Sequence, residues 1–369
     1  MFPQCLAPSR TCTRCATGAR SGVRWASLGH CRWTVARVLG TGHWQTATQP
    51  TVGCNLTLES VGYLLRLVVS VYLVLSCLDV ALTRYHRWNF VASEPKPQAK
   101  HVALVTGASS GLGKEMAYQL AEKGHSLLLA ARSEAVLERI QTEIEQVHGT
   151  VKVSIYACDL TSEAGIDSLV TFAAKNGLVV DILVNCAGFS ITKDFVGLSQ
   201  TQVTQIMALD MAAVAQLTHA FVPQMVVRGV GRVLNMGSMA GSIVSPSAAL
   251  YSSAKAFVIT FSQGLDYELR GTGVTVTCFC PGPVHTNFGS TADCDDAIYM
   301  NIPGTACAPK VCAALALQAM FRGQTLAYDT WFAYISAVLG ACVSPRRLLA
   351  AICAVGMNAP SKIWQMLRC

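Results

Sequence analysis

Charge is scarce in this 369-residue sequence, in which 13% of the residues are charged and 52% are hydrophobic. A core of ordinary size is therefore available, and the excess of apolar residues indicates contact with lipid. Acidic residues are missing altogether from residues 1–58, whose six arginines supply +6 of the net charge of +7. The remaining +1 leaves no basic face on the folded part. We therefore expect no nucleic-acid partner.

A second pair of metal ligands is also missing. Cys12 and Cys15 form one Cys-x-x-Cys pair, but no other cysteine or histidine pair stands at zinc-ligand spacing from it, so we expect no metal site. The 16 cysteines are scattered through a large apolar chain and do not resemble the framework of a small secreted domain. We expect reduced, buried thiols on apolar strands, among them Cys158, Cys186, Cys278 and Cys280.

No internal repeat or low-complexity tract divides the chain, but its composition changes along its length. Residues 1–58 are rich in arginine and show no apolar period, which is typical of a mitochondrial targeting segment and also of a disordered one. Residues 61–82 are long and apolar enough for a transmembrane or membrane-anchor helix, with Arg66 and Asp79 near its ends. A buried or surface-lying amphipathic helix is the alternative.

The basic residues near this segment bear on its orientation. Four of them follow it within about 20 positions: Arg84, Arg87, Lys96 and Lys100. This bias favours a cytosolic catalytic domain, whereas the more distant arginines of residues 1–58 oppose it. If residues 1–58 are instead cleaved on import, the location is the mitochondrion.

A linker at residues 93–100 leads into a third region. From residue 101 to about 330, apolar runs of strand length alternate with amphipathic stretches of helix length, which predicts an α/β domain with a parallel sheet. Residues 331–369 form an apolar extension, in which 331–356 predict two short helices that pack on the domain or dip into one leaflet. The predicted strands are residues 101–106, 126–131, 151–157, 181–187, 231–238 and 274–280, with a weaker seventh at 325–330.

A glycine-rich turn follows the first predicted strand directly. It has the spacing G-x-x-x-G-x-G, and a helical stretch begins behind it. Glycines let the backbone approach a pyrophosphate, and the helix N-terminus directs free N–H groups at the negative charge. The strand–turn–helix context therefore predicts a dinucleotide site rather than a plain turn. Its candidate residues are Gly107, Ser109, Ser110, Gly111, Leu112 and Gly113.

The end of the second strand bears on the choice of cofactor. An acidic residue there binds the ribose 2′-hydroxyl of NAD, whereas an arginine accommodates a 2′-phosphate. Arg132 stands at this place without a carboxylate, so we expect NADP(H), although a solvated arginine at a helix start gives the same pattern. Two further candidates, Asp159 and Leu160, follow the third strand beside the adenine. Three more end the fourth strand beside the cleft: Asn185, Ala187 and Gly188.

A tyrosine and a lysine four residues apart open a later predicted helix. Tyr251 and Lys255 therefore share one helical face, and the cation favours the phenolate and lowers the pKa of the tyrosine, as general acid–base work requires. Lys255 can also hydrogen-bond the nicotinamide ribose. Ser238 ends the fifth strand, where its hydroxyl can polarise a carbonyl. A tyrosine–lysine pair alone is common on helix surfaces, but its combination with this serine and the glycine turn is not.

Taken together, these motifs resemble the short-chain dehydrogenase/reductase family over about residues 101–290. The resemblance rests on TGASSGLG, CDL, NCAG, the Ser-x12-Tyr-x3-Lys pattern and the PGPVHT run at residues 281–286. It implies a single doubly wound Rossmann domain with a seven-stranded parallel sheet. It also implies hydride transfer between a nicotinamide and a carbonyl carbon, in a dimer or tetramer.

The resemblance also implies roles for single residues. Tyr251 is then the general acid in reduction, Ser238 binds the carbonyl oxygen, and Lys255 tunes Tyr251. The nicotinamide side of the cleft is then lined by Pro281, Gly282, Val284 and Thr286.

One position departs from the family pattern. The family usually has an asparagine on the helix before the fifth strand, which holds a water in the proton relay to the lysine. The matching residue here is Asp210. Aspartate has nearly the same shape, and little is lost if the backbone carbonyl holds the water. We nevertheless expect the added negative charge near Lys255 to change the pH profile of the relay.

Within the family, residues 251–276 and the membrane-like helix are similar to endoplasmic-reticulum reductases of steroids and very-long-chain 3-oxoacyl thioesters. The chain is also similar, more loosely, to uncharacterised bacterial reductases. We therefore expect a membrane-associated, NADPH-dependent reductase of a lipophilic ketone: a 3-oxoacyl thioester, a keto-sphingoid base or a steroid. The alternatives are a mitochondrial 3-oxoacyl reductase and a catalytically silent, nucleotide-binding membrane adaptor. Asp210 favours the adaptor, and the intact serine, tyrosine and lysine oppose it.

Overall fold

The structure, a computed structural model, describes most of the chain from residue 95 onwards. The described residues are 95–97, 100–285 and 305–342, with isolated positions between 63 and 78 and between 350 and 353. The chain divides into two compact units, Met1–Val71 and Tyr72–Cys369. Thr286 and residues 1–58 lie outside the described residues, so the predictions made for them stay predictions.

Seven parallel strands form one sheet in the order β3-β2-β1-β4-β5-β6-β7. The direction of winding reverses between β1 and β4, the place where open α/β sheets bind ligands. The predicted doubly wound Rossmann domain is confirmed, including its weak seventh strand. The strands are β1 His101–Thr106, β2 Ser126–Ala131, β3 Val153–Ala157, β4 Val179–Asn185, β5 Gly231–Met236, β6 Val274–Cys280 and β7 Leu326–Tyr328.

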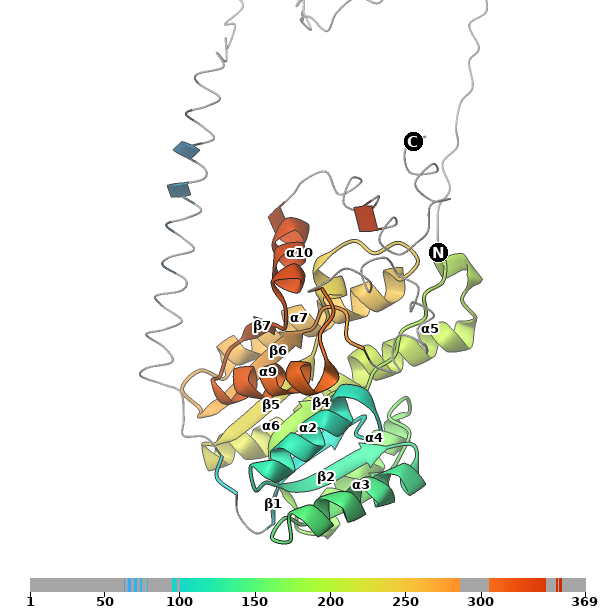
Figure 1. Ribbon diagram of the computed structural model, residues 1–369, viewed down its shortest axis with the longest axis vertical. Coiled ribbons are helices and arrows are strands. Elements are labelled where there is room, and N and C mark those ends of the chain that lie inside the picture. Colours follow the sequence, from blue (N-terminus) through green and yellow to red (C-terminus); the bar gives the residue numbers. More distant parts are fainter. Residues whose placement is uncertain are drawn as a thin grey trace, which may run out of the picture. The chain divides into compact units, whose positions relative to one another are not determined.

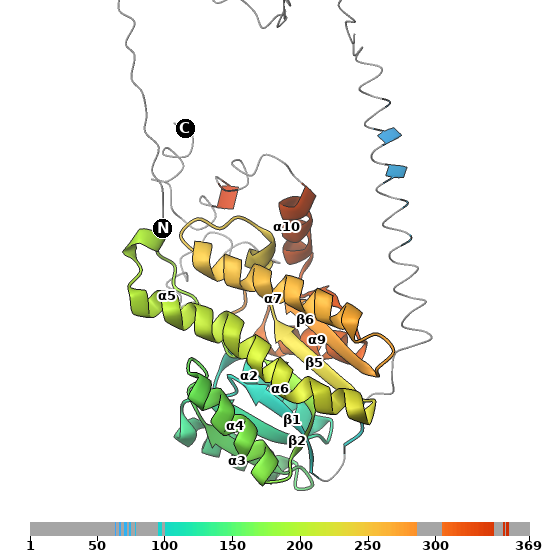
Figure 2. The same cartoon turned by 180° about the vertical axis from the view of Figure 1, so that it is seen from behind.

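Helices cover both faces of the sheet. Figure 1 shows α2, α3 and α9 over one face, and Figure 2 shows α4, α6 and α7 over the other. Because neither face of the sheet meets water, the strands read as nearly continuous apolar runs. The helices are α2 Gly111–Glu122, α3 Glu134–Val147, α4 Glu163–Lys175, α5 Gln200–Met207, α6 Ala213–Arg228, α7 Ala249–Glu268, α9 Pro309–Phe321 and α10 Trp331–Cys342.

Successive residues of each strand point to opposite layers of the core. In β1, Ala103 and Val105 pack under α2, whereas Val102 and Leu104 pack in the layer of α4 and α6. All four side chains are buried. This two-layer core fixes the strands, and so fixes the loops that leave their carboxyl ends.

The predicted bounds of four strands, the third, fourth, fifth and seventh, were wrong by one or two residues. The fourth strand runs from Val179 to Asn185 and the fifth ends at Met236. Cys158 and Cys186 therefore follow their strands and are half-buried, whereas Cys278 and Cys280 lie inside β6 and are buried as expected. These four thiols are free, as the sequence predicted.

One long helical stretch, Gln200–Arg228, is apolar enough to cross a membrane among the residues that the structure describes. It comprises α5, a π-helical turn η2 (Ala208–Ala212) and α6. The α6 part packs against β4, β5 and β6, with Leu217 and Met225 buried in the core. Its apolar composition is therefore explained by its place in the domain.

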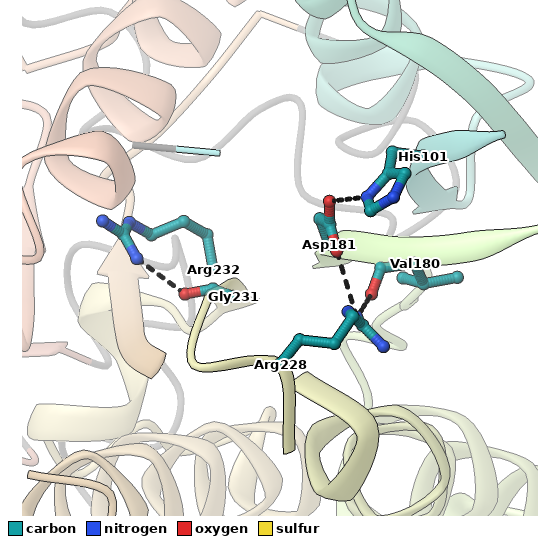
Figure 3. A network of polar contacts seen from close by, with 6 residues as sticks. All are labelled: His101, Val180, Asp181, Arg228, Gly231 and Arg232. Carbon is teal, nitrogen blue, oxygen red and sulfur yellow. Dashed lines mark hydrogen bonds and ion pairs between the residues drawn. The ribbon is translucent and has the colours of Figure 1, made fainter. Parts of the chain in front are cut away.

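A partly buried ion-pair network closes the amino-terminal edge of the sheet (Figure 3). Asp181 of β4 pairs with Nη2 of Arg228 at 3.0 Å and with the ring of His101. The same guanidinium donates to the carbonyl of Val180 at 2.7 Å. These contacts tie β1, β4 and α6 together at the edge away from the glycine-rich turn.

The helix α10 is apolar on its outer side. Its small residues face the domain: Ala333 and Ala337 are buried, and a Cβ on Gly340 would lie 2.0 Å from the carbonyl oxygen of Ser242. Its large side chains recur with helical spacing and are 37–64% exposed. We call this set the α10 stripe; it consists of Trp331, Tyr334, Ile335, Val338 and Leu339.

The predicted membrane helix at residues 61–82 is described at only seven positions. All seven are helical and exposed, and five of them carry large apolar side chains. Membrane insertion of this segment stays a prediction. The apolar positions are Tyr63, Leu67, Val71, Val74 and Leu78.

Candidate active site

The candidate residues meet at the carboxyl edge of the sheet, because each of them follows a parallel strand or packs on the loops there. The first loop is the glycine-rich turn after β1. Gly107 has a φ of +65°, a conformation that favours glycine. A Cβ on Gly113 would lie 2.4 Å from the carbonyl oxygen of Gly107. The turn therefore folds tightly onto the start of α2, and only glycine fits at these two positions.

The N-terminus of α2 has the form that a pyrophosphate site requires. Ser110 is its N-cap and makes no side-chain cap hydrogen bond, and the helix begins at Gly111. Ser109, Gly111 and Leu112 are partly exposed. Backbone N–H groups at such an end attract anions. The glycine cradle and the helix end together fit a dinucleotide, as the sequence predicted.

Thr106, at the end of β1, joins this turn to the end of β4. Its hydroxyl donates to the carbonyl of Val184 at 3.2 Å and accepts from the N–H groups of Cys186 and Ala187 at 3.0 and 3.1 Å. The two loops on either side of the switch point are therefore held as one unit. The sequence analysis did not assign a role to Thr106, which sits one residue before the first glycine.

The predicted adenine-side residues follow β2 and β3. Arg132 is exposed directly after β2, where a 2′-phosphate would lie. Asp159 accepts from the N–H of Thr161 at 3.0 Å and so shapes the turn before α4. Leu160 is buried in the core, so a cofactor would meet its backbone rather than its side chain.

Asn185 has a side chain that points into the protein rather than the cleft. Its Nδ2 donates to Oδ1 of Asn235 at 2.8 Å and lies 3.2 Å from the hydroxyl of Thr218. Asn235 in turn donates to Ser262 of α7 at 3.0 Å. Asn185 therefore braces β4, β5 and α7 behind the site. The following Ala187 and Gly188 are partly exposed at the cleft.

The predicted serine stands two residues after the end of β5. Ser238 is buried and caps a short 3₁₀ turn, η3 (Met239–Ser242), by accepting from the N–H of Ala240 at 3.1 Å. The hydroxyl hydrogen of Ser238 is thus free of that bond, since the oxygen is the acceptor in it. The N–H of Met239 donates to the carbonyl of Pro281 at 3.0 Å, which links this loop to the loop after β6.

The loop after β6 is anchored by a carboxylate that the sequence analysis missed. Asp329, directly after β7, accepts from the N–H of Gly282 at 2.8 Å. Val284 forms a parallel bridge with Cys307. Pro281, Gly282 and Val284 therefore lie at the carboxyl edge of the sheet, and their contact with the nicotinamide stays a prediction. An acidic residue just past the last strand was the available signal for Asp329.

Three possible metal ligands also meet here: Cys307, Cys312 and Asp329 have ligand atoms within 4.8 Å of one another. Hydrogen bonds account for the arrangement, because the thiol of Cys312 lies 3.7 Å from the carboxylate whose other oxygen holds Gly282. Burial, followed by Asp329, raises the pKa of the Cys312 thiol. We assign the cluster a structural role in holding the loop after β6.

Tyr251 and Lys255 lie on the first two turns of α7, on one face, as predicted. The ammonium of Lys255 lies 5.6 Å from the centroid of the Tyr251 ring and donates to the carbonyl of Met236 at 3.1 Å. Lys255 is buried and Tyr251 is half-buried. The helix α7 packs against η3, which brings the serine loop next to the tyrosine.

Asp210 makes the most direct contact with the lysine. It lies in the π turn η2, is fully buried, and its Oδ1 is 2.9 Å from Nζ of Lys255. Its other oxygen accepts from the N–H of Phe189 at 3.3 Å. A Cβ on Gly188 would lie 2.6 Å from Oδ1, so that glycine leaves room for the carboxylate. The negative charge that the sequence placed near Lys255 is therefore in contact with it.

Comparison with known proteins identifies the family to which the chain belongs. Residues 101–296 match the short chain dehydrogenase family, and the chain belongs to it. The resemblance seen in the sequence is thus confirmed.

Two relatives illustrate the range of sequence similarity. A very-long-chain 3-oxoacyl-CoA reductase of Laccaria bicolor is 39% identical over 177 residues, which are 47% of this chain and 52% of the relative. An uncharacterized oxidoreductase of Staphylococcus aureus is 31% identical over 185 residues, 50% of this chain and 78% of that one. The chain thus spans about half the length of the 3-oxoacyl-CoA reductases that it matches.

A solved structure shares the fold. The short-chain dehydrogenase from Sphingobium yanoikuyae in complex with NADPH superimposes with a TM-score of 0.58 and 29% identity, over 65% of this chain and 92% of that one.

Proposed function

We propose that the protein is an NADPH-dependent oxidoreductase that interconverts a carbonyl and a secondary alcohol on a lipophilic substrate. The observation that carries this proposal is the buried Lys255, held by Asp210 and the carbonyl of Met236 with its ammonium 5.6 Å from the centre of the Tyr251 ring. A buried cation beside a phenol is what an acid–base tyrosine needs.

In carbonyl reduction, Tyr251 gives its phenolic proton to the substrate oxygen as that oxygen gains negative charge. Ser238 donates a hydrogen bond to the same oxygen, using the hydrogen that its bond from Ala240 leaves available. Lys255 stabilises the phenolate that remains. The cofactor, when bound in the glycine cradle, supplies the hydride to the carbonyl carbon.

The preference for NADPH over NADH is supported by one residue and one neighbour. Arg132 is exposed at the end of β2, where its guanidinium can pair with a 2′-phosphate. The Sphingobium dehydrogenase was solved with NADPH.

A lipophilic substrate is supported by the α10 stripe and by the 3-oxoacyl-CoA reductases among the relatives. The stripe is apolar and uncharged, and α10 packs on η3, the turn that Ser238 caps. A substrate leaving a bilayer would reach the site along this helix. We place the catalytic domain on the cytosolic side of the endoplasmic reticulum, with the mitochondrion as the alternative, and we expect a homo-oligomer.

The test is cofactor oxidation by the full-length, detergent-solubilised protein with a panel of 3-oxoacyl thioesters, keto-sphingoid bases and steroid ketones. We expect turnover with NADPH well above that with NADH, and loss of at least about 100-fold in kcat for Tyr251→Phe. Tyr267→Phe is the matched control, because Tyr267 is exposed on the same helix. Cofactor binding without turnover on any ketone or alcohol would indicate a nucleotide-binding adaptor instead.

A further inference from the structure

The contact between Asp210 and Lys255 has a consequence for the tyrosine. Both partners are buried, the two charges are 2.9 Å apart, and the remaining carboxylate oxygen is held by the N–H of Phe189. The pair is therefore fixed in one geometry. Burial alone would lower the pKa of Lys255, but Asp210, followed by Tyr251, raises it above its ordinary value.

Two cysteines near Lys255 have thiols that are neutral at physiological pH, because their pKa is raised. Cys186 follows β4, and burial raises the pKa of its thiol to about 12. Cys280 of β6 has a thiol pKa raised by its hydrogen bond with Cys278 and by burial. Tyr251 lies one turn away on α7. Burial raises the pKa of Asp210, whereas Lys255 and the N–H of Phe189 favour its carboxylate form. Because the ammonium of Lys255 lies 2.9 Å from it, we take Asp210 as the negative charge in this group.

Resting on the proposed role of Tyr251, we propose that Asp210 is a positioning residue that cancels much of the charge of Lys255 and so keeps Tyr251 in its protonated, proton-donating form at neutral and mildly alkaline pH. With an asparagine at this place, the lysine would act on the tyrosine as an uncompensated cation. With a carboxylate, the tyrosine faces an ion pair. The substitution biases the site towards carbonyl reduction, for which the tyrosine must hold its proton.

The sign follows from the charges. A nearby cation favours the phenolate and lowers the pKa of Tyr251, and a carboxylate that pairs with that cation opposes this effect. The pKa of Tyr251 is therefore higher with Asp210 than with asparagine. Reduction needs the phenol and fails as pH rises through this pKa, whereas alcohol oxidation needs the phenolate and appears over the same range.

The experiment is a titration of tyrosinate absorbance in the full-length holoprotein with bound NADP⁺, which requires no substrate. The difference in absorbance between wild type and Tyr251→Phe gives the titration curve of Tyr251 beside Asp210. The difference between Asp210→Asn and the double variant Asp210→Asn/Tyr251→Phe gives the titration curve of Tyr251 without the carboxylate. We expect Asp210→Asn to lower the midpoint by about one pH unit. Asparagine keeps the shape and an oxygen for Lys255, so the fold is expected to persist.

The matched control is Asp181→Asn, which removes another buried, paired carboxylate at the opposite edge of the sheet. It should lower thermal stability and leave the Tyr251 midpoint in place. An unchanged midpoint in Asp210→Asn, or one that moves up, overturns the inference. A move up would mean that Asp210 serves to keep Lys255 charged.

The titration separates this inference from the reductase assignment. A midpoint that falls in Asp210→Asn supports the inference even if no ketone is turned over. If a ketone substrate is found, the alkaline limit of reduction should fall with the midpoint, with kcat affected more than KM. Reduction with an unchanged alkaline limit in Asp210→Asn counts against the inference and leaves the reductase assignment standing.

Discussion

Gly113 has no room for a side chain, because the carbonyl oxygen of Gly107 occupies the space that a Cβ would need. At the scale of single residues, the site depends on glycines without a side chain as much as on functional groups. Gly188 likewise leaves space for the carboxylate of Asp210. The reactive groups and the small residues beside them therefore form one arrangement, and a single methyl group can disturb it.

We expect Gly113→Ala to weaken NADPH binding at least tenfold and to cost about 1–3 kcal/mol of folding free energy, because the new Cβ would lie 2.4 Å from the Gly107 carbonyl. Isothermal titration and thermal unfolding measure the two effects. The control is Gly264→Ala on α7, which meets nothing within 4 Å and should add about 0.5–1 kcal/mol of stability. Normal cofactor affinity in Gly113→Ala would contradict the cradle.

At the scale of elements, α10 contacts η3 through Gly340 and β7 through Tyr334. Gly340 abuts the carbonyl of Ser242, and the rings of Tyr334 and Tyr328 meet edge to face at 5.7 Å between centroids. Since Ser238 caps η3, a shift of α10 against this turn would also move the serine. The helix is therefore part of the wall of the site as well as an exposed apolar surface.

We expect Gly340→Ala to lower kcat several-fold and to destabilise the protein by about 1–3 kcal/mol, because its Cβ would lie 2.0 Å from the Ser242 oxygen. Steady-state kinetics in detergent, beside thermal unfolding, test this. Leu339→Ala, on the exposed side of the same helix, should leave kcat within about twofold. Equal effects of the two changes would argue against coupling between α10 and the serine loop.

At the scale of the whole molecule, apolar side chains are exposed on α10 and at the described positions between residues 63 and 78. Elsewhere, exposed valines such as Val147 and Val227 stand on separate helices. The α10 stripe differs from such isolated residues because its apolar side chains are contiguous along one helix. A contiguous uncharged stripe of this kind is typical of a surface that contacts a membrane or another molecule.

We expect Ile335→Glu with Leu339→Glu to weaken binding of the full chain to phosphatidylcholine vesicles at least tenfold, since each apolar side chain contributes about 1.5–3 kcal/mol when it leaves water. Vesicle flotation measures this. The control pair, Val147→Glu with Val227→Glu, changes the charge equally on exposed residues outside the stripe. Equal binding by both pairs would mean that α10 does not contact lipid.

The sequence by itself determined the fold class and predicted most of the candidate site. Strands that are buried on both faces of a parallel sheet are continuous apolar runs, so they can be recognised without knowing which strands they pair with. The glycine turn, Ser238 and the Tyr251–Lys255 pair can be recognised because their chemistry depends on their spacing in the sequence. Some strand ends were wrong by one or two residues, since burial rather than composition sets where pairing stops.

Only the tertiary structure decided which distant groups touch. Asp210 and Lys255 are 45 residues apart in the chain, and their 2.9 Å contact depends on the π turn, on Gly188 and on the packing of α7. Asn185, a cofactor candidate in the sequence, proved to brace the interior, and Asp329 proved to hold Gly282. Hydrogen bonds between loops of different strands leave no periodic trace in a sequence, because they depend on where the sheet brings the strand ends together.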